Sequence, residues 1–64
     1  MPDHDRLAAL DAEIAIIRDN LRELTEQAAA QSGAANEDLA AERIAKQEAK
    51  LAALLTQREA AAKA

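Results

Sequence analysis

The fold is decided by the stretch from Leu7 to Ala28, which reads LAALDAEIAIIRDNLRELTEQA. Its regularly placed aliphatic residues are separated alternately by three and four positions: Leu7, Leu10, Ile14, Ile17, Leu21, Leu24 and Ala28. This is the heptad spacing of a coiled-coil helix, in which one narrow apolar stripe packs against a partner helix. Three uninterrupted heptads predict a long amphipathic helix over about residues 4–31.

Capping signals bracket this helix and predict where a second one begins. Asp3 is well placed to accept hydrogen bonds from the free amides of the first turn. At the other end, Gly33 suits the left-handed position that commonly follows a helix, which predicts a turn over about residues 32–36. Asn36 is then expected to cap a second helix over about residues 37–61.

The second predicted helix has a less regular stripe: Ala40, Ile44, Gln47, Leu51, Leu54, Arg58 and Ala61. Gln47 and Arg58 interrupt it. A polar side chain at a core position can fix the register of a helix pair, whereas a long polar side chain at the edge buries only its stem. The edge position is the favoured interpretation for Arg58, and both interpretations stay open for Gln47.

The two stripes match when the chain is folded about the turn. A short connection makes the helices antiparallel neighbours, so residues whose numbers sum to about 68 lie at the same level. Ile17 then faces Leu51, and Leu24 faces Ile44. The sequence therefore predicts an all-α fold, an antiparallel two-helix hairpin of the coiled-coil type that forms a single domain over residues 1–64. Its expected core consists of Leu7, Leu10, Ile14, Ile17, Leu21, Leu24, Ile44, Leu51 and Leu54.

Three large aliphatic residues, Ile16, Leu39 and Leu55, fall outside these stripes. A wider apolar face is typical of a helix with two neighbours, while isolated surface aliphatics are the alternative. A chain of 64 residues without cysteine or aromatic residues has few means of stabilising a small core. We therefore expect a homodimeric four-helix bundle, or docking onto helices of a partner protein, with these three residues as the candidate partner surface.

Catalysis is not expected, because acidic side chains fall on outward positions of thin helices rather than in a cleft that would shift their pKa values. The Ser and Thr hydroxyls lack a histidine partner, and no cofactor site is expected. His4 could bind Cu(II) or Ni(II) in a square-planar site together with Pro2 and Asp3 at a processed N-terminus. A solvated terminus with an inert histidine is the favoured interpretation.

The net charge of −4 arises in the first half of the chain and disfavours binding to nucleic acid or to anionic membranes. Arg43, Lys46 and Lys50 are interleaved with acidic residues, and the chain offers no aromatic ring for base stacking. The longest aliphatic run is too short to span a bilayer, and the N-terminus lacks the pattern of a signal peptide. The expected compartment is the cytoplasm. A small regulator, either an RNA-binding hairpin or an antitoxin-like protein, is the alternative function.

Two segments carry a family resemblance: Leu10–Ile14, which reads LDAEI, and Ala41–Leu51, which reads AERIAKQEAKL. In these segments the chain resembles the small bacterial helical-hairpin proteins of the YdcH and SlyX kind, whose role is uncharacterised. Leu7 stands where the YdcH kind usually has a histidine. The resemblance implies a helical hairpin and no particular activity.

Overall fold

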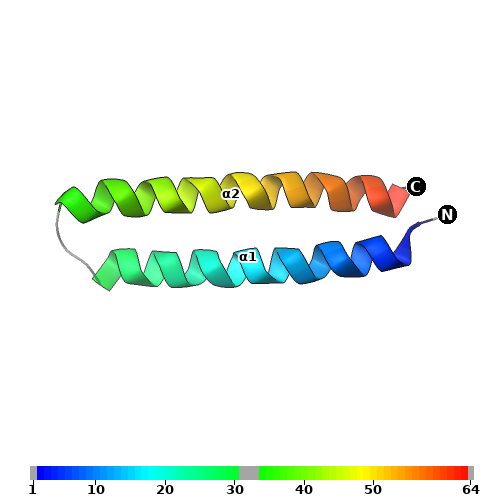
Figure 1. The fold of residues 1–64 in the computed structure, drawn as a ribbon, viewed down its shortest axis with the longest axis horizontal. Coiled ribbons are helices and arrows are strands. Elements are labelled where there is room, and N and C mark those ends of the chain that lie inside the picture. The colour runs from blue at the N-terminus through cyan, green and yellow to red at the C-terminus, as the bar shows by residue number, and fades with distance from the viewer. Residues whose placement is uncertain (1, 31–33, 64) are drawn as a thin grey trace.

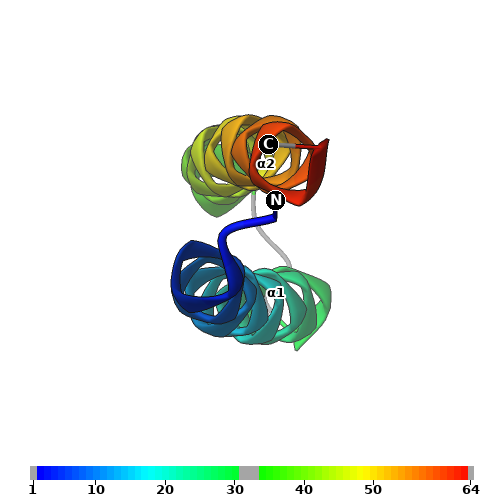
Figure 2. The ribbon, with the colours of Figure 1, turned by 90° about the vertical axis from the view of Figure 1, so that its right-hand side faces the viewer.

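The computed structural model of the chain describes residues 2–30 and 34–63, without the side chains of residues 34–36. It contains two helices, α1 (His4–Ala30) and α2 (Ala34–Lys63). They run antiparallel and side by side, so both chain ends lie at the same end of the molecule (Figures 1 and 2). The Cα trace measures 50 × 14 × 10 Å. The predicted all-α hairpin is confirmed.

Asp3 caps α1 as predicted and also ties the two ends of the hairpin together. Its Oδ1 accepts a hydrogen bond from the Arg6 amide at 3.1 Å, and its carbonyl accepts one from the Leu7 amide at 2.9 Å. The first bond satisfies an amide that the helix itself leaves without a partner, and the second is the first backbone hydrogen bond of the helix. The Asp3 amide donates to the Ala61 carbonyl of α2 at 3.4 Å, so the start of α1 is held against the end of α2.

The start of α2 differs from the sequence prediction. The helix begins at Ala34 rather than near Glu37, and Asn36 therefore lies inside its first turn instead of capping it. Alanine is the strongest helix former, so Ala34 and Ala35 extend the helix toward the N-terminus. Glu37 still lies in the first turn, where its charge is favourable to the helix dipole. Gly33 lies outside the described residues.

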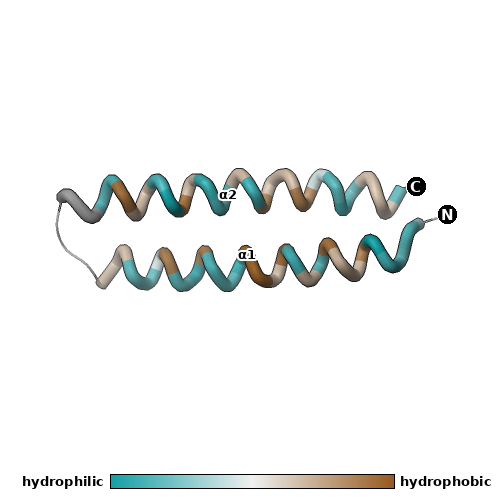
Figure 3. Tube along the Cα trace, viewed as in Figure 1, coloured by the Kyte–Doolittle hydropathy of each residue, from teal (hydrophilic) through white to brown (hydrophobic). Residues whose placement is uncertain are grey.

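The core is a single seam between the helices. In α1 the residues that are not exposed are those of the predicted stripe, with Leu10, Ile14 and Ile17 buried and the others half-buried. In α2 the stripe from Ala40 to Leu54 is half-buried, Ala61 is buried and Arg58 is exposed. Hydrophobic residues, drawn in brown, accordingly return at intervals along both helices (Figure 3). The hairpin has one thin apolar layer.

Charged residues one turn apart pair along the outer surfaces of the helices. Glu42 and Lys46 approach to 3.6 Å, and Glu59 and Lys63 to 3.0 Å. Both pairs have the acidic residue on the N-terminal side, which is the more favourable order in a helix. They are solvent-exposed, so each contributes only about 0.3–0.5 kcal/mol to the stability of α2.

Candidate interaction surface

The heptad repeat divides the remaining surface of the hairpin into two sides. Successive residues of a helix are rotated by about 100° about its axis. The residues next to the seam residues in the sequence therefore lie on one side of the seam or on the other. One side carries two surface hollows, and we call it the hollowed side. α1 contributes Glu13, Ile16, Asn20, Glu23 and Gln27 to these hollows, and α2 contributes Arg43, Lys46, Lys50, Ala53 and Gln57.

The first hollow surrounds Ile16. It has a volume of about 450 Å³ and lies between the α1 residues Glu13, Ile16 and Ile17 and the α2 residues Lys50, Ala53, Leu54 and Gln57. Ile16 is 59% exposed, more than either Leu39 or Leu55. Its neighbour Ile17 is buried in the seam. An apolar floor with an exposed isoleucine on its rim can take up a side chain of another helix.

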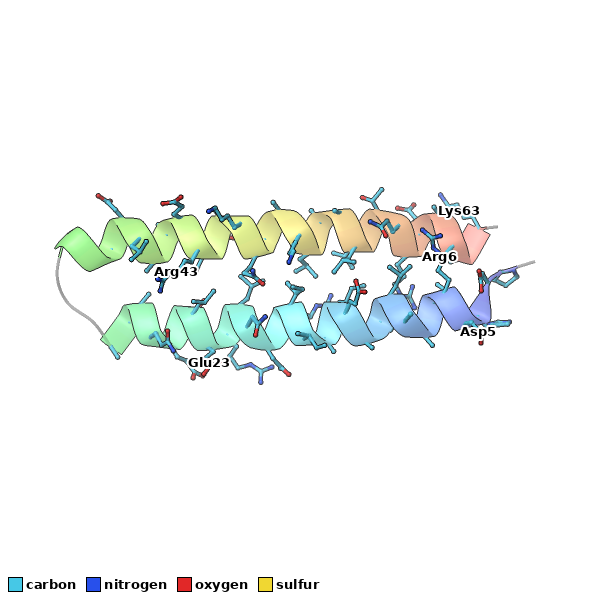
Figure 4. The ribbon with its side chains drawn as sticks, in the orientation of Figure 1. Asp5, Arg6, Glu23, Arg43 and Lys63 are labelled. Atoms are coloured by element: carbon cyan, nitrogen blue, oxygen red, sulfur yellow. The ribbon has the colours of Figure 1, made fainter. Side chains whose placement is uncertain are left out.

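The second hollow lies nearer the turn and has walls of opposite charge. Glu23 stands on the α1 wall, and Arg43 and Lys46 stand on the α2 wall. Arg43 extends from α2 toward α1, while Glu23 lies on the flank of α1 that faces away from α2 (Figure 4). Lys46 pairs with Glu42 on its own helix, and among the described residues Glu23 forms no ion pair.

Gln47 forms part of this second hollow and carries an unsatisfied polar atom. The residue is half-buried, and its Oε1 is buried without a hydrogen-bond partner in the described part of the chain. A buried carbonyl oxygen without a donor is destabilising by about 1–3 kcal/mol. The sequence left two interpretations open for Gln47, a polar side chain in the core or one at the edge of the seam. The buried oxygen agrees better with a position in the core.

The opposite side of the hairpin contains Leu55 and an ion pair between the helices. Leu55 lies beside a hollow of about 350 Å³ together with Asp11, Ile14, Arg18 and Arg58. The Arg58 guanidinium donates to both carboxylate oxygens of Asp11, from Nε to Oδ1 and from Nη2 to Oδ2 at 3.5 Å. The hydrogen bond to Asp11 and the negative charge of that carboxylate raise the pKa of Arg58 above its ordinary value.

The structure separates the residues expected to form one partner surface. Ile16 lines the hollowed side, whereas Leu55 lines the opposite side, and their hollows share no residue. Leu39 precedes Arg43 by one helical turn and Lys46 by two, which places it on the hollowed side. Leu39 is 47% exposed and Leu55 is 40% exposed. The hairpin therefore offers two separate faces, and the hollowed side carries Ile16 and Leu39, which are more exposed than Leu55.

Comparison with protein-family models, with curated proteins and with solved structures finds no match to this chain. The resemblance to the YdcH and SlyX kind of hairpin stays a prediction. The surface itself is therefore the basis for any statement about function.

The N-terminal segment has a structural role in the hairpin. His4 is exposed and is the first residue of α1. The Asp3 amide, which a square-planar Cu(II) or Ni(II) site would need as a ligand, donates to the Ala61 carbonyl. Metal binding at this amide would break the contact that joins the two helix ends. Within residues 2–30 and 34–63, no cluster of three or more metal-binding side chains is found.

Neither helix has an apolar stretch long enough to span a bilayer, as judged over the described residues.

Two features of the surface were not predicted from the sequence. The numbers of Asp11 and Arg58 sum to 69, so the predicted register already places them at the same level, and their opposite charges were the signal for a pair. The unsatisfied oxygen of Gln47 had no sequence signal, because the direction of its side chain depends on packing in the seam.

Proposed function

We propose that this chain is a non-enzymatic helical interaction module, which acts by packing its exposed helix faces against other helices. The helices are supplied by a second copy of the chain or by a partner protein. The cytoplasm is the compartment expected from the sequence.

One observation carries this proposal: large aliphatic residues stay exposed although the seam of the hairpin is already filled. Ile16, Leu39 and Leu55 are exposed on faces that α1 and α2 do not use against each other. Burial of a leucine or isoleucine side chain stabilises a protein by about 1.5–3 kcal/mol. Covering these faces with helices would therefore stabilise a hairpin whose own buried core is small.

The test is thermal unfolding, followed by far-UV circular dichroism, at concentrations from micromolar to millimolar. If unfolding is coupled to dissociation, the Tm rises with protein concentration, and we expect that rise. A Tm that stays constant over this range, for a chain that is well folded at the lowest concentration, would contradict self-association. A screen for helical partner proteins would then be needed to support the remaining form of the proposal.

A small RNA-binding regulator is the second candidate, because Arg43, Lys46 and Lys50 lie on the same edge of α2. Their positive charge attracts phosphate groups, although Glu13 and Glu23 stand across the same hollows. An electrophoretic mobility assay at low salt tests this candidate. Retardation of a mixed RNA pool that is lost in Lys46→Glu would support it, and free migration at tens of micromolar protein would exclude it.

A further inference from the structure

We propose that a second copy of this chain docks on the hollowed side, with the two turns at the same end of the dimer, so that α1 of each copy lies against α2 of the other. This inference rests on the proposed function and specifies the partner, the face and the orientation. It follows from the surface area, the charges and the placement of the exposed aliphatic residues.

The hairpin has more accessible surface than a compact monomer of its mass. Its surface is 4770 Å² for a mass of 6.8 kDa, whereas a typical folded monomer of that size exposes about 3,950 Å². The excess, about 800 Å², is close to the area that each partner buries in a standard stable interface. Burial of an interface of this size on each copy would bring the accessible surface of the hairpin close to that of a compact protein of its mass.

Two arrangements bring the hollowed sides of two identical hairpins together about a two-fold axis. If the axis is parallel to the helices, the two turns lie at the same end, and α1 of each copy faces α2 of the other. If the axis is perpendicular to the helices, the turns lie at opposite ends, and like helices face each other. The charges on the hollowed side distinguish the two arrangements.

With the turns at the same end, unlike charges face each other. Glu23 lies at the level between Arg43 and Lys46 of the hairpin, so across the dimer it faces these two basic residues of the other copy. With the turns at opposite ends and the helices fully overlapped, Glu13 of one copy lies near Glu23 of the other. Lys50 then lies close to its own counterpart. Like charges in such contacts are unfavourable, so the arrangement with both turns at one end is selected.

The aliphatic residues fit the same arrangement, because large side chains then face small ones. Ile16 lies at the level of Ala53 of the other copy, and Leu39 at the level of its Ala30. Small residues opposite large ones allow helices to interlock closely.

The orientation is tested by a distance between spin labels. The chain contains no cysteine, so Glu37→Cys introduces a single labelling site on the exposed surface of α2 near the turn. With both turns at one end, we expect an interlabel distance below about 25 Å, because the two helices lie within one bundle cross-section. With the turns at opposite ends, the labels would be about 40 Å apart at 1.5 Å per residue. A distance near 40 Å would overturn the proposed arrangement.

The face is tested by a matched pair of substitutions, one on each side of the hairpin. Ile16→Gln should weaken dimerisation at least tenfold, while Leu55→Gln should change it less than twofold, as measured by sedimentation equilibrium with circular dichroism as the folding check. The reverse pattern would place the interface on the opposite side and overturn the inference. Lys46→Glu should also weaken the dimer, and the double variant with Glu23→Lys should recover it.

The outcomes separate this inference from the proposed function. A dimer with the long interlabel distance, or one that depends on Leu55, contradicts the arrangement or the face but leaves self-association intact. A folded chain that is monomeric at all concentrations contradicts the inference and the self-association form of the proposed function, and leaves docking on a partner protein as its remaining form. Only a dimer with the short distance and dependence on Ile16 supports the inference.

Discussion

At the scale of single residues, Gln47 is the polar member of the seam with the clearest energetic consequence. Its Oε1 is buried and has no hydrogen-bond partner among the described residues. Gln47→Leu removes this atom and adds apolar contact with the facing stripe of α1, so we expect the free energy of unfolding to rise by about 1 kcal/mol. Gln47→Glu keeps the shape of the side chain and places a carboxylate there, so it should lower that free energy.

Denaturant unfolding of the two variants at one protein concentration is the measurement. Opposite effects of the two substitutions are expected from a buried amide. If both variants unfold at the same denaturant concentration as the original chain, the Gln47 side chain would have to lie in solvent at the edge of the seam.

The ion pair of Asp11 and Arg58 also acts at the scale of single residues, and its contribution to stability depends on pH and on salt. Asp11 raises the pKa of Arg58, so the stabilisation is fully present below the ordinary pKa of arginine and is lost only as the pH rises through the higher folded-state value. Arg58 therefore adds no pH dependence to stability near neutrality. Both side chains are about half exposed, so salt should screen the pair.

At the scale of the helices, α1 carries two isoleucines with opposite roles. Ile14 is 5% exposed and packs in the seam, whereas Ile16, two positions later, points to the hollowed side. Ile14→Ala should lower the free energy of unfolding by about 2–5 kcal/mol, which is comparable with the total stability of a domain of this size. Ile16→Ala should leave the helical signal of the hairpin intact and affect association alone.

Far-UV circular dichroism at high and low protein concentration compares the two variants. Loss of helix in Ile14→Ala at both concentrations, together with retained helix in Ile16→Ala, is the expected pattern. Equal effects of the two substitutions would mean that α1 does not present a single stripe to α2.

The helix pair could be predicted from the sequence because its signals are local. The alternation of three and four positions from Leu7 to Ala28 sets the buried stripe of α1. Asp3 caps this helix by accepting a hydrogen bond from the amide of Arg6, only three residues further along the chain. The start of α2 was predicted too late, because the cap expected at Asn36 gave no weight to the helix-forming residues Ala34 and Ala35 before it.

The candidate surface was only partly predictable. The spacing of Ile16, Leu39 and Leu55 predicted that they lie outside the seam. It did not lead to the prediction that they lie on two different sides of the hairpin. This division follows from the 100° turn per residue once the partner helix is placed. The hollows depend on how side chains of both helices pack, and no single helix carries a signal for them.

At the scale of the whole molecule, the hairpin is long and thin. A body whose Cα trace measures 50 × 14 × 10 Å leaves most side chains exposed, and only a few residues of the seam are buried. Two such bodies packed side by side would form a four-helix bundle with a second layer and a central core. Association is therefore the simplest way for this chain to gain the burial that one hairpin lacks.

The most direct test of this claim is the molar mass in solution, measured by light scattering across a concentration series. We expect a mass of twice the 6.8 kDa of the single chain at tens of micromolar, falling toward 6.8 kDa only on strong dilution. A mass of one chain throughout the series, with the full helical signal of the hairpin retained, would contradict it.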